Sequence, residues 1–169
     1  TGVQTCALPI WNFPDMKFII FTNLEDTPID EYIFDVIPEN VLCISAVNAI
    51  AHGGKVIPAP YGVQRKMSPN DNRIENLKEY ISLPNSSEFN LLYVSHNESS
   101  HSDRVGTNSI FANKEWAIVD KQRVEYRDFL SRLKKSKFML CPRGNAIDCH
   151  RNWEVLYMKK IGRAHVWTP

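Results

Sequence analysis

The hydrophobic and polar positions of the first part of the chain predict short strands separated by turns. Two apolar runs rich in Ile, Val and Phe, Lys17–Phe21 and Val41–Val47, have the length and composition of buried strands. Between them, Ile29–Ile37 predicts a short helix, which the next residue, a proline, ends. A third apolar piece, Lys55–Ile57, runs into a loop rich in Pro and Gly at Pro58–Gly62.

The second part alternates predicted strands with predicted helices. Strands are expected at Phe89–Val94, Trp116–Val119 and Lys137–Cys141, and the helices that follow them at Ser102–Asn113, Val124–Lys135 and Cys149–Lys160. In the middle helix, Tyr126, Phe129, Leu130 and Leu133 recur at i, i+3, i+4 and i+7, which makes one face apolar. Three consecutive β-α units predict an α/β fold with a parallel, Rossmann-like sheet and right-handed crossovers.

Ligands of such sheets bind beyond the carboxyl ends of the strands. Three loops are expected at that edge: Ser95–His101, Asp120–Arg123 and Pro142–Asp148. The predicted sheet therefore points to these loops as the place to look for a binding site.

The pattern divides the chain into segments of different character. We expect an α/β portion at 11–67, a polar connection at 68–87 with a helix from Asn72 to Ile81, and a second α/β portion at 88–160. The ends, 1–10 and 161–169, do not continue the periodicity of their neighbours and resemble translated adapter sequence. We expect both ends to lie outside the fold and the natural chain to continue past them. The alternative is that they are ordinary frayed termini.

Charge and composition narrow the function classes. The 169 residues hold 20 Lys and Arg against 19 Asp and Glu, well mixed, which is unlike the basic surface of a nucleic-acid-binding protein. No apolar run approaches the roughly 18 residues of a membrane span. Four unevenly placed cysteines do not form a disulfide framework and indicate a reducing compartment. The expected location is the cytoplasm or the membrane periphery, or the Golgi in a eukaryote.

The last predicted strand, loop and helix hold the parts of a phosphate site. Gly144 and Asn145 can adopt positive φ angles, which a tight loop needs, and Asp148 is placed to cap the following helix. Free N–H groups and the positive end of the helix dipole favour an anion at that helix start. Arg143 and Arg151 add guanidinium groups that match phosphate oxygens.

Other interpretations of this segment stay open. Glu154, one turn after Arg151, is suited to grip ribose hydroxyls, but the two could equally form an exposed ion pair of about 0.3 kcal/mol. His150 could be a capping or surface residue. Cys141, Cys149 and His150 lack the spacings of two to four residues that structural zinc sites use, and Cys141 fits better as a small buried residue. No local signature supports a cysteine nucleophile paired with His150 or His52.

This segment resembles the signature of the exostosin-like glycosyltransferases of the family-47 type. There a strand leads into a Pro-Arg-Gly loop, an Asp, a His-Arg pair and a Trp-Glu on a helix, and the matching positions are Pro142, Arg143, Gly144, Asn145, Asp148, His150, Arg151, Trp153 and Glu154. Weaker similarity extends to Leu91–Arg104, Val56–Gly62 and Asn23–Asp26. Ala146 departs from the family's usual second Gly, and Lys159 and Lys160 stand where small residues are usual.

The resemblance implies an incomplete GT-B glycosyltransferase, which retains the C-terminal donor domain and part of the N-terminal, acceptor-side domain. The implied reaction is metal-independent transfer of a sugar from a nucleotide-diphosphate sugar to a glycan or another hydroxyl acceptor, with no cofactor. By analogy the donor would be bound by Arg104, Arg143, Gly144, Asn145, Asp148, His150, Arg151 and Glu154. The family's next strand is missing, so the resemblance does not imply that this chain alone is active.

The catalytic base stays unassigned, with Asp26, His52 and Asp103 as the candidates. The alternative from another class is a non-catalytic Rossmann-like module that binds a nucleotide or a glycan without transferring it. The sequence leaves open the donor sugar, the acceptor, the linkage and any membrane association of the full-length protein.

Overall fold

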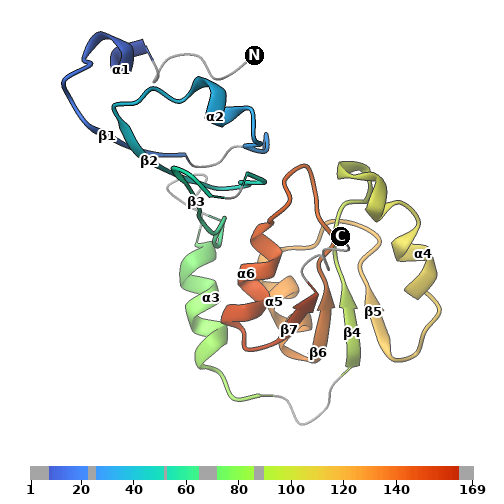
Figure 1. Cartoon of the computed structure of the whole chain (residues 1–169). Helices are drawn as coiled ribbons and strands as arrows, with labels where there is room; N and C mark the ends of the chain where they lie inside the picture. Colours follow the sequence, from blue (N-terminus) through green and yellow to red (C-terminus); the bar gives the residue numbers. More distant parts are fainter. Residues whose placement is uncertain (1–7, 23–25, 52, 65–71, 86–89, 164–169) are drawn as a thin grey trace. The chain divides into compact units, whose positions relative to one another are not determined.

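The computed structural model of the chain describes residues 8–22, 26–51, 53–64, 72–85 and 90–163 (Figure 1). Within these ranges the protein is α/β, and it holds two sheets in which every strand pair is parallel. The chain divides between Tyr61 and Gly62 into two compact units, each with one sheet. The predicted α/β class with parallel, Rossmann-like sheets is confirmed at this level.

The first unit has a three-stranded sheet in the order β1-β2-β3. Its elements are α1 (Leu8–Asn12), β1 (Phe18–Phe21), α2 (Ile33–Val36), β2 (Val41–Ala46) and β3 (Val56–Pro58). The strands agree with the predicted ones, but the helix expected at Ile29–Ile37 is only α2. Ile29 instead forms a parallel bridge to Ala49, so the segment before α2 extends the sheet edge rather than the helix.

One face of this small sheet carries exposed apolar side chains. In β1 half-buried and exposed residues alternate, and Ile19 and Phe21 are 56% and 77% exposed. Ile57, which pairs with Ser45 in the register of β2 and β3, is also exposed. The prediction that β1 is a buried strand is therefore confirmed only in part within the described residues, because only the face towards Val41 and Ile44 is packed there.

The second unit has a four-stranded sheet in the order β5-β4-β6-β7. Its elements are α3 (Arg73–Ser82), β4 (Asn90–Val94), the 3₁₀ helices η1 (Glu98–Ser100) and η2 (Ser102–Arg104), α4 (Thr107–Phe111), β5 (Ala117–Val119), α5 (Tyr126–Lys134), β6 (Ser136–Leu140), α6 (His150–Tyr157) and β7 (Ile161–Arg163). The predicted apolar face of α5 is confirmed, since Phe129, Leu130 and Leu133 are buried against Tyr93 and Met139 of the sheet.

Two expectations for this unit are wrong. The helix predicted at Ser102–Asn113 is split into η2 and α4, because Gly106 between them has a φ angle of 77°, which breaks a right-handed helix. Residues 161–163, placed outside the fold by the sequence pattern, form β7 and pair in parallel with β6. At the other end of the chain, Ile10 is buried in the core of the first unit, so residues 1–10 are not wholly outside the fold either.

Helix α3, which falls within the predicted connection, packs into the second unit. Leu77 joins the core around Phe129, and Tyr80 and Ile81 pack against it. A buried lysine of α5, Lys134, donates hydrogen bonds to the carbonyls of Tyr80 (2.9 Å) and Leu83 (2.6 Å) at the end of α3. Those carbonyls have no partner inside the helix, so the ammonium group fixes the end of α3 against α5.

Replacing Lys134 by Met should lower the free energy of unfolding by about 1 to 3 kcal/mol, the range for lost hydrogen bonds to a charged group. The side chain keeps its length, but two carbonyls lose their donor. Urea unfolding followed by circular dichroism measures the change, with the exposed neighbour Lys135→Met as the control. Equal stability of the two variants would contradict the capping role.

Candidate functional site

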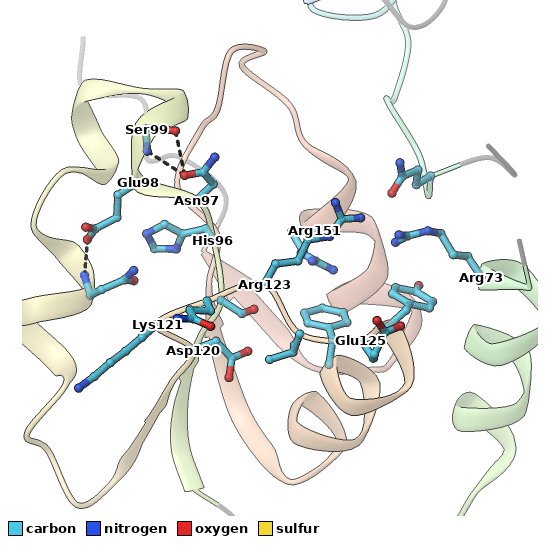
Figure 2. A pocket seen from close by; sticks show the side chains of 17 residues that line it. Arg73, His96, Asn97, Glu98, Ser99, Asp120, Lys121, Arg123, Glu125 and Arg151 are labelled. Atoms are coloured by element: carbon cyan, nitrogen blue, oxygen red, sulfur yellow. Dashed lines mark hydrogen bonds between the residues drawn. The ribbon is translucent and has the colours of Figure 1, made fainter. Parts of the chain in front are cut away.

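A pocket of about 890 Å³ opens at the carboxyl edge of the second sheet (Figure 2). Its walls come from the segments after β4 and β5, the starts of α4 and α5, one residue each of α3 and α6, and Gln64. The lining residues used below are Arg73, His96, Glu98, Asn108, Asp120, Lys121, Arg123, Glu125, Tyr126, Phe129 and Arg151. The loops Ser95–His101 and Asp120–Arg123 thus contribute to a pocket at the expected edge, whereas no residue of Pro142–Asp148 lines it.

Basic side chains outnumber acidic ones in the lining of the pocket. Four cations line it: Arg73, Lys121, Arg123 and Arg151. Two of the three lining carboxylates are already engaged. Asp120 accepts hydrogen bonds from Tyr93 and Arg132, and Glu98 accepts from the backbone N–H of Asn108 (2.7 Å). The hollow therefore suits an anion better than a cation.

Arg151 is held in a fixed place by two contacts. Its Nη1 donates to Glu154 Oε2 at 2.7 Å, and its guanidinium carbon lies 3.7 Å from the centroid of the Phe129 ring. Glu154 is only 2% exposed and does not line the pocket. The Glu154 carboxylate thus pairs with Arg151 and does not reach into the pocket. This ion pair takes the place of the contact with ribose that was expected for Glu154. The pair is also not the exposed one that generic spacing allowed, because one partner is buried.

A second arginine, Arg73, lies over the ring of Tyr126, which is next to Phe129 on α5. The Arg73 guanidinium carbon is 4.7 Å from the centroid of Tyr126, and the Tyr126 and Phe129 rings stack with centroids 5.8 Å apart. Burial is the main cause that raises the pKa of the Tyr126 hydroxyl, and the charge of Glu154 and a hydrogen bond to it act in the same direction. The hydroxyl therefore stays protonated, and the aromatic pair forms a rigid floor under both arginines.

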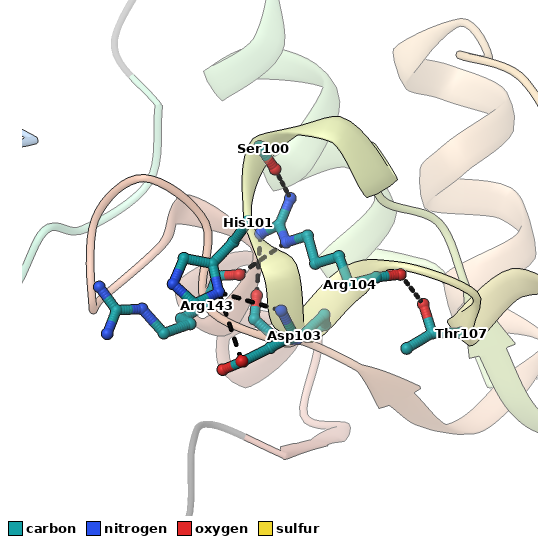
Figure 3. Close-up of polar contacts among 7 residues, drawn as sticks. Ser100, His101, Asp103, Arg104, Thr107 and Arg143 are labelled. Atoms are coloured by element: carbon teal, nitrogen blue, oxygen red, sulfur yellow. Dashed lines mark hydrogen bonds and ion pairs between the residues drawn. The ribbon is translucent and has the colours of Figure 1, made fainter.

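Arg104, expected to reach the donor phosphates, makes several hydrogen bonds inside the protein. Only 9% of it is exposed, and its Nε and Nη2 donate to the carbonyls of Arg143 (2.7 Å) and Pro142 (2.8 Å). Its Nη1 donates to Ser100 Oγ at 2.8 Å (Figure 3). With these donors used inside the protein, Arg104 ties the loop after β6 to the 3₁₀ helices after β4.

Gly144 is required for a reason that the sequence pattern did not show. Positive φ angles occur elsewhere among the described residues but at neither Gly144 nor Asn145, so that expectation is wrong. A Cβ at Gly144 would instead meet Arg104 Nη2 at 3.0 Å. The glycine makes room for the buried guanidinium rather than for an unusual backbone angle.

The substitution Gly144→Ala should therefore destabilise the second unit by about 1 to 3 kcal/mol, the usual cost of inserting a methyl group into a packed site. Arg104 cannot move away without breaking hydrogen bonds. Thermal unfolding by calorimetry gives the shift. In an Arg104→Met background the same glycine substitution should cost much less, and an equal cost in both backgrounds would contradict the clash.

The start of α6 already holds a carboxylate of the chain itself. Cys149, not Asp148, occupies the capping position. Asp148 Oδ1 accepts from the Cys149 N–H (2.8 Å) and from Asn152 Nδ2 (3.2 Å), and its Oδ2 accepts from the Trp153 indole (2.7 Å). Asp148 is thus hydrogen-bonded within the chain beside this helix start.

The other residues expected to bind the sugar donor lie at different places around the loop after β6. Arg143 does not line the pocket, and Figure 3 shows its side chain extending away from Arg104. Asn145 is exposed. His150 Nδ1 donates to the Gly62 carbonyl at 2.7 Å and so fixes the segment that precedes α3. Of the residues expected to bind the donor, Arg151 alone lines the pocket.

Two of the three candidates for the catalytic base fall in the described residues, one in each unit. Asp26 belongs to the first unit, is exposed and accepts a hydrogen bond from the Tyr61 hydroxyl at 3.3 Å. Asp103 lies in η2 of the second unit, beside His101 and away from the pocket lining. His52 falls outside the described residues.

His96 lines the pocket and belongs to the loop Ser95–His101, which the sequence pattern placed at the binding edge. Its Nε2 lies 2.6 Å from Thr107 Oγ1, whose hydroxyl donates to the Arg104 carbonyl at 2.7 Å. Because the hydroxyl hydrogen is used there, Nε2 must be the donor, which leaves the lone pair on Nδ1. Within the described part of the chain Nδ1 is buried without a partner. Burial, helped by the charge of Arg104, lowers the pKa of His96 to about 4.

Stability should consequently fall as the pH falls from about 6.5 to about 4. In that window the unfolded chain binds a proton at His96, whose ordinary pKa is 6.5, and the folded chain does not. Urea midpoints at pH 7 and pH 5 measure the loss, which should be smaller in His96→Gln. An identical loss in that variant would show that other groups cause it.

No protein-family model matches the chain, and no curated protein matches it. Within the described ranges, no group of three or more His, Cys, Asp or Glu side chains is arranged as metal ligands would be. None of the helices described is long and apolar enough to cross a membrane.

Proposed function

We propose that the second unit binds the nucleotide-diphosphate part of a sugar donor and that the chain is part of a GT-B glycosyltransferase. The observation that supports this best is the cluster of Arg73, Lys121, Arg123 and Arg151 around one pocket at the carboxyl edge of a parallel sheet. Ligands of open α/β sheets bind at this edge, and guanidinium groups match phosphate oxygens two at a time.

The size and the floor of the pocket agree with a nucleotide ligand. A volume of about 890 Å³ is within the range of small-molecule sites. Arg151 is the principal phosphate ligand, because Glu154 and Phe129 hold it in place before any ligand arrives. The remaining donors of its planar group can then bind an anion with little further ordering.

In the proposed reaction the main contribution of the pocket is to stabilise the leaving group. When an acceptor hydroxyl attacks the sugar carbon and gives its proton to a base, negative charge builds up on the departing diphosphate. Fixed cations near that charge stabilise the transition state more than the ground state. The resemblance to exostosin-like enzymes supports the same reaction, and under it the first unit belongs to the acceptor-side domain. The base and the acceptor are not assigned.

Isothermal titration calorimetry with UDP tests the binding site. Arg151→Ala should weaken binding by about 1.5 to 3 kcal/mol, the scale of a hydrogen bond to a charged group. Because this change also strands the buried Glu154, the same substitution is measured in a Glu154→Gln background. The exposed β6 residue Lys137→Ala is the control. Wild-type affinity in both Arg151 variants would contradict the proposed site.

Turnover separates an enzyme from a binding module. Incubation with a panel of UDP-sugars should release UDP by slow hydrolysis, or by transfer when a glycan acceptor is added. Tight UDP binding with no release over the whole panel would favour the non-catalytic alternative.

A further inference from the structure

One of the three carboxylates in the pocket lining differs from the other two. Asp120 and Glu98 accept hydrogen bonds from other groups of the protein. Glu125 is exposed, and within the described residues its carboxylate takes part in no hydrogen bond or ion pair. Among the described lining residues, Glu125 is therefore the acidic group that can accept a hydrogen bond from a ligand without losing one from the protein.

The helix fixes the backbone of Glu125 but does not need its side chain. Glu125 stands at the N-cap position of α5, and its carbonyl accepts a hydrogen bond from the Phe129 N–H at 2.9 Å. Its side chain makes no capping hydrogen bond, and Glu is not among the residue types preferred at this position. The formation of α5 thus does not account for a carboxylate at the edge of the pocket.

The same helix places Glu125 on the phosphate side of the proposed site. The next residue, Tyr126, stacks on Phe129, and the Phe129 ring lies under the Arg151 guanidinium group. Figure 2 shows Glu125 on the side of the pocket where Arg151 lies, with His96 on the other side. In a nucleoside diphosphate the ribose is attached directly to the first phosphate. A group that contacts the ribose is therefore needed on this side of the pocket.

A free carboxylate suits hydroxyl groups and repels phosphates. An ionised carboxylate only accepts hydrogen bonds, and it does so with two oxygens. The neighbouring 2′ and 3′ hydroxyls of a ribose supply two donors, and hydrogen bonds to an ionised acceptor are stronger than those between neutral groups. In dinucleotide-binding sites at the same edge of parallel sheets, an acidic side chain accepts hydrogen bonds from ribose hydroxyls.

We propose that Glu125 binds the ribose hydroxyls of the nucleotide, so that the pocket selects ribonucleotides over 2′-deoxyribonucleotides. This inference rests on the proposed function. It assigns to Glu125 the contact that the sequence pattern suggested for Glu154, whose carboxylate is buried and paired with Arg151. A 2′-deoxyribose leaves the phosphates and the base unchanged but has one of the two hydroxyl donors removed.

Calorimetric titration with UDP and 2′-deoxy-UDP tests this contact. The wild type should bind UDP about tenfold more tightly than 2′-deoxy-UDP, the scale of one hydrogen bond to a charged group. Glu125→Gln keeps the size of the side chain but leaves a neutral acceptor, and it should reduce the ratio to less than about threefold. Glu125→Ala removes both oxygens and should bring the ratio close to one.

The ratio of the two affinities isolates the hydroxyl contact. UDP and 2′-deoxy-UDP carry the same charge, so any general effect of removing a negative charge from the pocket changes both affinities alike. Asp128→Asn is the matched control, because Asp128 is an exposed acid in the first turn of α5 that does not line the pocket. This variant should keep the wild-type ratio.

The outcomes separate this inference from the proposed function. Equal binding of both nucleotides by the wild type, or a wild-type ratio in Glu125→Gln and Glu125→Ala, would overturn the ribose contact while UDP binding through Arg151 still stood. The same fall of the ratio in Asp128→Asn would also overturn it. A wild-type chain that binds neither nucleotide would contradict the proposed function, and the ribose contact with it.

Discussion

The buried carboxylate of Glu154 is the constraint around which the pocket is arranged. A carboxylate that is only 2% exposed is costly unless it is paired and hydrogen-bonded. Arg151 supplies the charge, and the Tyr126 hydroxyl supplies a further hydrogen bond. Satisfying Glu154 therefore also fixes the Arg151 side chain on Phe129 and the Tyr126 ring beside it, which together make the floor and one wall of the site.

Arg104 holds the backbone of the neighbouring segments in place in a comparable way. It joins the segment after β4 to the loop after β6 through carbonyl oxygens, and Gly144 leaves the space that it needs. The Pro-Arg-Gly loop is thus linked to the rest of the second unit, and Asp148 accepts a hydrogen bond from the Trp153 indole beside it. The site is displaced from this loop to the neighbouring segments after β4 and β5, where the arginines converge.

Local patterns predicted the frame of the protein well. The apolar runs gave β2, β4, β5 and β6 close to their observed limits, since short buried strands are specified by their own side chains. The apolar face of α5 was equally evident because i, i+3 and i+4 positions must share one side of a helix. The helix predicted at Ser102–Asn113 did not take account of Gly106, whose positive φ angle interrupts it. Strand β7 was not predicted, because its short sequence has little strand character and the strand is defined by its pairing with β6.

The site was predicted less well, because its geometry depends on contacts distant in the sequence. The spacing of Arg151 and Glu154 predicts that they share one helix face. Only the structure shows that Glu154 is buried and therefore pairs with Arg151 instead of contacting a ligand. Arg73 could not be found from local sequence, since its ring partner is on another helix.

The most direct measurement is a crystal structure of the chain with UDP. Phosphate density within hydrogen-bonding distance of Arg151 is the expected result. Phosphates bound beside Arg143 at the start of α6, with the arginine pocket empty, would contradict it.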